Sequence, residues 1–257
     1  MTSTYDRIAR FYDVDMAQNM RFDDVAFYRH QCMRRPGRVL ELGCGNGRIL
    51  LPLLARGLDI VGVDASGAML GELARKARAR GLAPRTVHAD VRRLPLRRAF
   101  ATVLAPYSLV TYMAAEGDLA RFLAAARDVL LPGGRLVLDA FVPRPVQANP
   151  TFTQDYRRAF GAFTLVRSKR VTPVDAATNR IERRYELAGA DGGVVECFDV
   201  AEVIRPCAPG ALRAAANAAG LTPITEAYDY GTRPDGTDAQ FFTLVCRAPA
   251  LRETRSD

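Results

Sequence analysis

The sequence predicts an α/β fold: a doubly wound, mainly parallel sheet with a small antiparallel β insert. Apolar runs and helical stretches alternate through residues 38–142, which is typical of strands joined by helical crossovers. A glycine-rich turn at residues 43–47 lies between the first apolar run and the first helix of that series. Beyond residue 145, strand-like segments follow one another with turn residues between them, which indicates antiparallel pairing.

The elements of the parallel part are expected in a regular order. A helix at residues 22–33 ends before Pro36 and Gly37, which break the chain ahead of the first strand. Strands joined by helices run parallel, because each crossover returns the chain to the same end of the sheet. Gly57 and Gly81 stand where helix C-caps are expected. Strands are expected at residues 38–42, 59–64, 85–90, 100–108 and 133–142, and helices at 48–57, 68–81 and 116–130.

The rest of the chain is expected to carry the insert and then to complete the core sheet. Residues 143–161 are interpreted as a loop. The insert strands are expected at residues 164–172, 179–189 and 194–206. A helix at 209–220 then precedes two strands, 221–231 and 239–249, which a tight turn should pair antiparallel at the sheet edge.

Composition limits the class of protein and its compartment. A chain of 257 residues is long enough for one sizeable core, and no apolar run approaches the length of a membrane span. The first dozen residues lack the apolar core of an export signal. The five cysteines show neither paired spacing nor nearby histidines, so reduced thiols and no metal site are expected. We therefore expect a cytoplasmic protein with no membrane partner.

The net charge of +8 raises the question of a nucleic-acid partner. The basic residues are 34 arginines and 2 lysines, spread along the chain rather than gathered in one stripe. An arginine excess of this kind is typical of GC-rich coding, so nucleic acid is not the expected partner.

The glycine turn and a following aspartate predict a ligand that contains a nucleoside. Gly43, Gly45 and Gly47 have no side chains, so the backbone N–H groups of the turn and the positive end of the next helix are open to a ligand. Asp64 ends the second strand, 23 residues after Glu41, where a sheet of this kind presents a carboxylate to ribose hydroxyls.

The spacing of the glycines separates two classes of ligand. A dinucleotide-binding turn of the pattern G-x-G-x-x-G needs its third glycine at position 48, where this chain has Arg48. Glu41 lies two residues before the first glycine, where it can accept hydrogen bonds from an ammonium group. A ligand with an amino acid at one end fits this turn better than a pyrophosphate.

The stretch ELGCGNG, the aspartate after the second strand and the HAD triplet at 88–90 resemble the class I S-adenosylmethionine-dependent methyltransferases. The resemblance covers residues 1–142 and the final strand pair. It implies a Rossmann-like sheet of strand order 3-2-1-4-5-7-6 with the last strand antiparallel, and S-adenosylmethionine as cofactor. It implies an N-terminal segment over the cofactor (1–36), a core (37–145), an insert over the substrate site (146–207) and a final helix and strand pair (208–250).

The resemblance also implies a role for each part of the site. The glycine turn and Glu41 would hold the methionine part, Asp64 the ribose hydroxyls, and Asp90 with the backbone of Val91 the adenine amino group. The opening YDRIARFYD is similar to small-molecule methyltransferases in which a tyrosine covers the cofactor, here Tyr5 or Tyr12; these rings equally fit a role as anchors of a helix. The expected cofactor-binding residues are Tyr12, Glu41, Gly43, Cys44, Gly45, Gly47, Asp64, Ala65, Met69, Asp90, Val91 and Ala105.

The chemistry of methyl transfer asks mainly for alignment and desolvation, because the cofactor carries its own activated leaving group. His30 on the N-terminal helix and His88 beside the adenine site are poorly placed to act as a base. The candidate catalytic residues are Tyr107 and Asp139 at the ends of the fourth and fifth strands. Asp199, Glu202, Tyr228 and Tyr230 are further candidates for a base, and transfer without a base stays open.

The loop after the fourth strand and the insert are the segments that bear on the class of methyl acceptor. Enzymes that methylate the exocyclic amines of nucleic-acid bases resemble one another in having Asn or Asp, then two prolines, then Tyr or Phe after the fourth strand. The loop Ala105-Pro106-Tyr107-Ser108 lacks the polar first residue and the second proline of that pattern. The insert resembles that of small-molecule N- and O-methyltransferases, which implies transfer to a nitrogen, oxygen or acidic carbon of a specialised metabolite. An RNA or protein methyltransferase and a cofactor-binding protein without transfer are the alternatives. The insert is expected either to form a homodimer interface or to serve as a cap.

Overall fold

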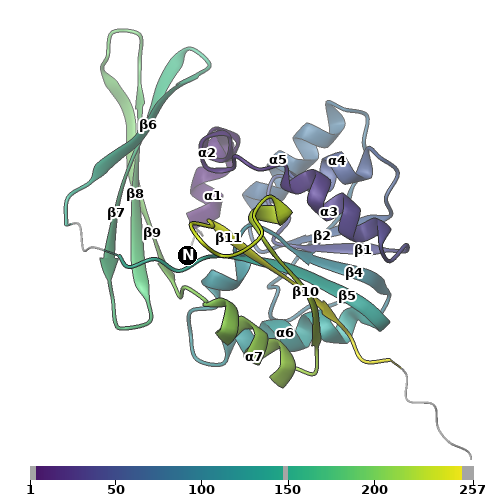
Figure 1. Ribbon diagram of the computed structural model, residues 1–257. Helices are drawn as coiled ribbons and strands as arrows, with labels where there is room; N and C mark the ends of the chain where they lie inside the picture. The colour runs from purple at the N-terminus through teal and green to yellow at the C-terminus, as the bar shows by residue number, and fades with distance from the viewer. Residues whose placement is uncertain (1–3, 147–149, 251–257) are drawn as a thin grey trace, which may run out of the picture. The chain divides into compact units, whose positions relative to one another are not determined.

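The computed structural model describes residues 4–146 and 150–250, and the chain separates into two compact units (Figure 1). One unit, called here the core unit, joins Phe22–Val142 to Cys207–Asp257. The other, called the insert unit, joins Met1–Arg21 to Pro143–Pro206. The segment expected at residues 1–36 is therefore divided between the two units.

The described residues of the core unit form a seven-stranded sheet in the order β10-β11-β5-β4-β1-β2-β3. The central pairs are parallel, and β11 runs antiparallel to both β5 and β10. This order confirms the predicted fold and strand order. The two final strands, predicted as strands 6 and 7, are numbered β10 and β11 because the insert strands precede them in the chain. The strands are β1 (Val39–Leu42), β2 (Ile60–Asp64), β3 (Arg85–His88), β4 (Phe100–Ala105), β5 (Leu130–Phe141), β10 (Thr222–Tyr228) and β11 (Phe241–Arg247).

Helices cover both faces of this sheet, with α3, α4 and α5 on one face and α6 and α7 on the other (Figure 1). Buried strands covered on both sides read as continuous apolar runs, which is why β1 and β4 were visible in the sequence. The helices are α3 (Asp24–Met33), α4 (Leu50–Leu54), α5 (Gly67–Arg78), α6 (Asp118–Val129) and α7 (Pro209–Ala218), with 3₁₀ turns η2 (Leu109–Tyr112) and η3 (Asp229–Gly231).

The two faces of the sheet differ in polarity. Leu40, Leu138 and Leu244 belong to the apolar cluster that includes Phe122 of α6 and Leu212 of α7. Because side chains alternate along a strand, the residues one position away project to the opposite face. That opposite face carries buried polar groups from neighbouring strands, namely Glu41, Thr102, Asp139 and Thr243. The sheet therefore presents buried carboxylates on the side of α3.

The insert unit contains one more strand than the sequence predicted. Among its described residues the antiparallel sheet runs β6 (Thr153–Phe160), β7 (Phe163–Pro173), β8 (Asn179–Ala188) and β9 (Val194–Ile204). The interpretation of residues 143–161 as a loop was wrong for β6. This strand forms a hairpin with β7 across Gly161, whose φ of +59° suits a tight turn. Its arginines and the prolines before it concealed the strand pattern.

The N-terminal residues pack on the insert sheet through one fully buried ring. They form α1 (Thr4–Ile8), η1 (Ala9–Phe11) and α2 (Tyr12–Asn19). The Phe11 ring lies 4.9 Å from that of Phe160 and 5.9 Å from that of Tyr185, measured between ring centres. Arg7 also donates a hydrogen bond of 2.8 Å to the backbone oxygen of Asp199 in β9. Residues far apart in sequence thus make up one core.

A search for membrane-spanning helices in the described residues found none of sufficient length and hydrophobicity.

Candidate functional site

The glycine turn after β1 adopts a backbone that side chains would disfavour. Gly43, Gly45 and Gly47 have φ angles of +66°, +52° and +84°, in the left-handed region. A Cβ at Gly47 would lie 2.8 Å from Cγ of Leu51, so space as well as conformation requires glycine there. The helix that follows, α4, has five residues and begins at Leu50. The turn itself, rather than a long helix dipole, therefore supplies the N–H groups of the site.

The same turn is held against β2. The Cys44 N–H donates to the Val63 oxygen at 3.0 Å, and the Cys44 side chain is buried. A Cβ at Gly62 would lie 2.6 Å from the Cys44 Sγ, so Gly62 provides the room for this thiol. Cys44, expected among the cofactor-binding residues, presents its backbone rather than its sulfur to the turn.

Asp64 links the glycine turn to the start of α5. Its Oδ2 accepts the N–H of Gly45 at 2.7 Å, and its Oδ1 accepts the N–H of Ser66 at 2.8 Å. Burial raises the pKa of the Asp64 carboxyl, and these backbone hydrogen bonds partly offset the rise. Each carboxylate oxygen has two lone pairs, so this geometry leaves acceptor capacity on both. Two adjacent hydroxyl donors match that capacity.

Glu41 is a buried carboxylate with an open acceptor. Its residue is 2% exposed, and its Oε2 accepts no hydrogen bond from any residue that the structure describes. Burial raises the pKa of Glu41 well above its usual range, while the charge of Arg48 acts in the opposite direction. A buried polar atom of this kind is costly unless a partner satisfies it. A ligand with a positively charged N–H donor would supply that partner.

Arg48 has a structural role that the sequence did not reveal. Its NH1 and NH2 donate to the two carboxylate oxygens of Asp24, both at 2.7 Å, and Asp24 is almost fully buried. This bidentate pair ties the glycine turn to the first residue of α3. The Arg48 guanidinium also lies 5.8 Å from the ring centre of Tyr107. An arginine 24 residues from its partner gives no local signal, so spacing alone did not identify the pair.

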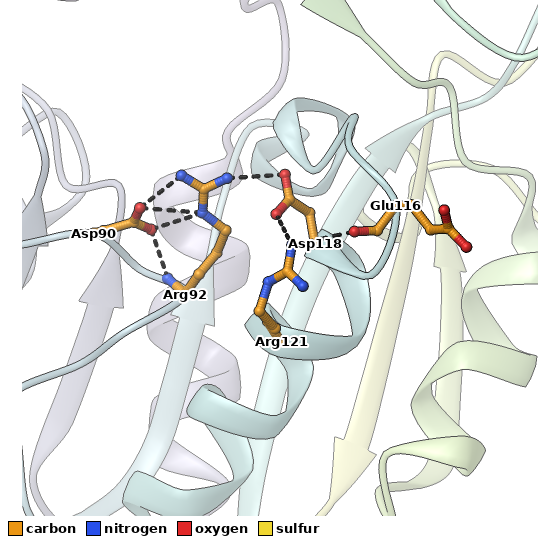
Figure 2. A network of polar contacts seen from close by, with 5 residues as sticks. All are labelled: Asp90, Arg92, Glu116, Asp118 and Arg121. Carbon is orange, nitrogen blue, oxygen red and sulfur yellow. Dashed lines mark hydrogen bonds and ion pairs between the residues drawn. The ribbon is translucent and has the colours of Figure 1, made fainter.

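Asp90 and Val91 follow β3, where the resemblance placed adenine recognition. Val91 is buried, whereas the Asp90 side chain is 40% exposed and lines a cavity of about 360 Å³. Arg92 donates to the Asp90 carboxylate from its guanidinium and from its backbone, as Figure 2 shows. These hydrogen bonds lower the pKa of Asp90. The carboxylate therefore faces the cavity in its ionised form.

Asp139 lies fully buried at the end of β5 and holds the loop after β4. It accepts the N–H of Tyr107 at 3.0 Å and that of Ser108 at 2.5 Å. Tyr28 and Tyr230 donate their hydroxyls to the same carboxylate. Burial raises the pKa of Asp139, and these hydrogen bonds partly offset the rise. Its oxygens are thus engaged within the protein.

The loop held by Asp139 is conformationally unusual. Tyr107 and Ser108 have φ angles of +56° and +58°, which are uncommon for residues with side chains. Ser108 further accepts the N–H of Phe141 on its Oγ at 2.7 Å. The Tyr107 ring lies 5.6 Å from the Phe141 ring and 6.1 Å from the Phe241 ring, between centres. Aromatic rings therefore pack against the expected catalytic loop at the carboxyl ends of β4 and β5.

Most of the predicted residues meet at one edge of the core sheet. The carboxyl ends of parallel strands share an edge, so the residues that follow β1, β2, β3 and β4 lie along it. Ala105 and Met69 are buried there, and Ala65 accepts a contact at 2.9 Å from Nε2 of His88 on its backbone oxygen. Tyr12 belongs to the insert unit, where its ring lies 6.2 Å from that of Tyr5. Its role over the cofactor stays a prediction.

The other candidates for a base have structural partners. Asp199 bonds Arg184 through both oxygens at 2.8 Å, across β8 and β9 of the insert. Glu202 likewise pairs with Arg183. Tyr228 packs against Phe242, with ring centres 5.5 Å apart. Among the described residues, the His, Cys, Asp and Glu side chains form no cluster suited to a metal ion.

Comparison with known proteins shows which proteins the chain resembles in sequence and in fold. A family profile described as "Methyltransferase domain" matches residues 39–134. The demethylmenaquinone methyltransferase of Thermus thermophilus is 33% identical over 174 residues, which are 66% of this chain and 70% of that protein. An S-adenosylmethionine-dependent methyltransferase from Clostridium acetobutylicum superposes with a TM-score of 0.79, at 18% identity, over 96% of this chain and 100% of its own. The sugar N-methyltransferase KedS8 from Streptoalloteichus superposes with a TM-score of 0.75, at 26% identity, over 97% and 94% of the two chains.

Proposed function

The chain belongs to the class I S-adenosylmethionine-dependent methyltransferases, and we propose that it methylates a small molecule, with an amine nitrogen as the acceptor. The likeness to the sugar N-methyltransferase carries this proposal, because it extends over 97% of the chain and so includes the β insert. Transfer to an oxygen or an acidic carbon is the broader form of the same proposal. The dispersed arginines support a small acceptor over RNA.

The residues at the sheet edge fit the cofactor of this family. Glu41 offers the ammonium of the methionine part a buried oxygen that accepts no hydrogen bond from the described residues, and the glycine turn offers its backbone. Asp64 keeps acceptor capacity for the ribose hydroxyls, and Asp90 presents a carboxylate to the adenine amine. When bound, S-adenosylmethionine supplies a methyl group already activated by a sulfonium. The protein has then to orient the acceptor and exclude water.

Tyr107 and Asp139 take different parts in this proposal. Tyr107 lies in the loop after β4, and to this residue of the pair we assign the contact with the reactants. Asp139 is enclosed by donors from the protein and acts through that loop as a positioning residue. A neutral amine attacks with its lone pair and can lose its proton to water after transfer. The reaction therefore needs no base from the chain.

The experiment is a binding and turnover assay on the purified protein. S-adenosylhomocysteine should raise the melting temperature and NADH should not, since a ligand stabilises the state that binds it. Consumption of S-adenosylmethionine is then measured with amino sugars and other small amines, and with RNA at low and moderate salt. Stabilisation by NADH alone would overturn the cofactor, and turnover confined to RNA would overturn the small-molecule acceptor.

Asp64→Ala provides the matched variant for the cofactor site. Loss of this carboxylate should abolish the thermal shift by S-adenosylhomocysteine, because it removes the acceptor for the ribose and unties the glycine turn. Asp59→Ala removes an exposed aspartate next to the same strand and should keep the shift. An unchanged shift in Asp64→Ala would contradict the ribose role.

A further inference from the structure

The Asp90 carboxylate, proposed to bind the adenine amino group, accepts hydrogen bonds on both oxygens from Arg92. Arg92 donates its backbone N–H and its Nε to Oδ1 of Asp90, at 2.8 and 2.9 Å. Its NH2 donates to Oδ2 at 2.6 Å, with a longer contact of 3.1 Å from Nε. Within the described part of the chain, the hydrogen bonds that this carboxylate accepts come from Arg92. We call this arrangement the Asp90–Arg92 clamp (Figure 2).

The clamp is itself anchored to the start of α6. NH1 of Arg92 donates to Oδ2 of Asp118 at 2.8 Å, and the Asp118 side chain is 6% exposed. The other oxygen of Asp118 accepts NH2 of Arg121 at 2.7 Å, and Arg121 also reaches the Glu116 backbone oxygen at 3.1 Å. A planar guanidinium bound at both ends cannot rotate without breaking charge-assisted hydrogen bonds. The orientation of Asp90 is therefore set from a different segment of the core unit.

The hydrogen bonds of the clamp determine what Asp90 can still bind. Each carboxylate oxygen has two lone pairs, and those of Oδ1 are taken by the backbone N–H and Nε of Arg92. Oδ2 receives its strong bond from NH2 and keeps one acceptor direction. Arg92 also holds the pKa of Asp90 below its usual value, so the carboxyl does not carry a proton to donate. Asp90 offers one acceptor and no donor.

We propose that Arg92 is a positioning residue that holds Asp90 as an acceptor for one amino group and so selects a 6-amino purine over its 6-oxo counterpart in the cofactor. This inference rests on the proposed function, since it takes the cavity beside Asp90 as the adenine subsite. A 6-oxo base presents a carbonyl oxygen, which an ionised carboxylate repels and cannot hydrogen-bond. Asp118 anchors the arginine.

The test measures selectivity rather than stability. Dissociation constants for S-adenosylhomocysteine and its 6-oxo analogue, S-inosylhomocysteine, are determined by calorimetry for the full chain and its variants. The unmodified protein should prefer the amino form by at least about tenfold, which is the effect of one charge-assisted hydrogen bond. Arg92→Gln should weaken S-adenosylhomocysteine about tenfold and bring the two ligands to similar affinities, because an Asp90 without its clamp is free to turn away from the 6-position of the base.

Matched variants separate recognition from folding. Arg97→Gln removes an exposed guanidinium from the same segment after β3, outside the residues that line the cavity, so its selectivity should match that of the unmodified protein. Asp118→Asn loosens the anchor of Arg92, so the melting temperature should fall and the selectivity should fall part of the way toward that of Arg92→Gln. Arg92→Lys keeps the charge without the fork and should restore part of the selectivity.

The possible outcomes decide the inference. Equal selectivity in Arg92→Gln and Arg97→Gln would overturn it, and so would a loss in Arg92→Gln that weakens both ligands by the same factor. If the unmodified protein binds neither ligand, the proposed cofactor fails instead. Circular dichroism of each variant verifies that the chain is folded during the measurement.

Discussion

Asp15 in the insert unit and Glu41 in the core unit are both buried carboxylates, yet their surroundings are opposite. Asp15 accepts hydrogen bonds from Tyr185 at 2.7 Å and from Tyr156, and it pairs with Arg167 at 2.8 Å. Glu41 is equally buried, with an oxygen that has no partner among the residues described. A buried acid whose acceptors are filled by the protein holds structure together. One with an open acceptor marks a place for a ligand.

The largest expected effect comes from breaking the filled network. Asp15→Ala leaves Arg167 buried with Asp155 as its remaining acidic neighbour and removes the acceptor of two tyrosine hydroxyls. Removing one partner of a buried ion pair costs about 4 kcal/mol of the free energy of unfolding. Urea unfolding followed by circular dichroism measures it. The control, Asp13→Ala on the exposed side of the same helix, should cost less than about 0.5 kcal/mol.

Asp139 is a buried carboxylate of the core unit whose oxygens accept hydrogen bonds from the protein, and its removal should destabilise the fold in the same way, with an added effect on turnover. Asp139→Asn keeps the shape but turns a donor toward the N–H groups of Tyr107 and Ser108. We expect about 3 kcal/mol of destabilisation from the unsatisfied groups. The rate at saturating cofactor should fall while S-adenosylhomocysteine affinity stays near its original value. An equal loss of both would contradict the positioning role.

Unlike the two variants above, Glu41→Gln should stabilise the folded protein in the absence of ligand. It should also weaken binding of S-adenosylhomocysteine. Loss of the charge should weaken S-adenosylhomocysteine about thirtyfold, which corresponds to about 2 kcal/mol for a charged hydrogen bond. Calorimetry measures this affinity. Glu72→Gln, which alters a surface pair with Arg75, serves as control and should leave affinity unchanged. Unaltered binding in Glu41→Gln would remove Glu41 from the site.

The pH dependence of the same variant sharpens the comparison. The folded-state pKa of Glu41 is raised by burial, so the folded protein binds this proton more tightly than the unfolded chain. Any stability tied to that proton is present below the ordinary pKa of about 4.3 and is lost as the pH rises through the folded value. Glu41→Gln has no carboxyl group at this position, so its stability does not fall with pH in this way. The stability advantage of the variant in the absence of ligand should therefore grow from pH 4 toward neutrality.

The smallest effect expected is the loss of one hydrogen bond in a filled network. Tyr230→Phe removes one donor to Asp139 and leaves Tyr28 and the two backbone donors. We expect about 1 kcal/mol of destabilisation, measured by urea unfolding. A loss as large as that of Asp139→Asn would show that Tyr230, rather than the backbone donors, carries the network.

Local patterns account for most of what was predictable. The parallel core was visible because buried strands read as apolar runs and helices end at glycines such as Gly57, whose φ is +82°. Gly47 stands in the turn after β1 and Asp64 is the last residue of β2, so a short window of sequence identifies both. By contrast, β6 was missed, because its polar residues, among them the consecutive Arg157 and Arg158, resemble a loop until a partner strand is known.

By itself, the sequence determined the strands of the parallel core, the glycine turn and the acids at the ends of the first three strands, because each depends on neighbours within a few residues. The strand order followed from the resemblance to a known family. The tertiary structure decided which carboxylates are filled and which stay open. Asp139 meets Tyr28 across 111 residues, and Asp15 meets Tyr185 across 170. Partners at such separations are chosen by packing of the whole chain, and no periodicity or spacing in the sequence encodes them.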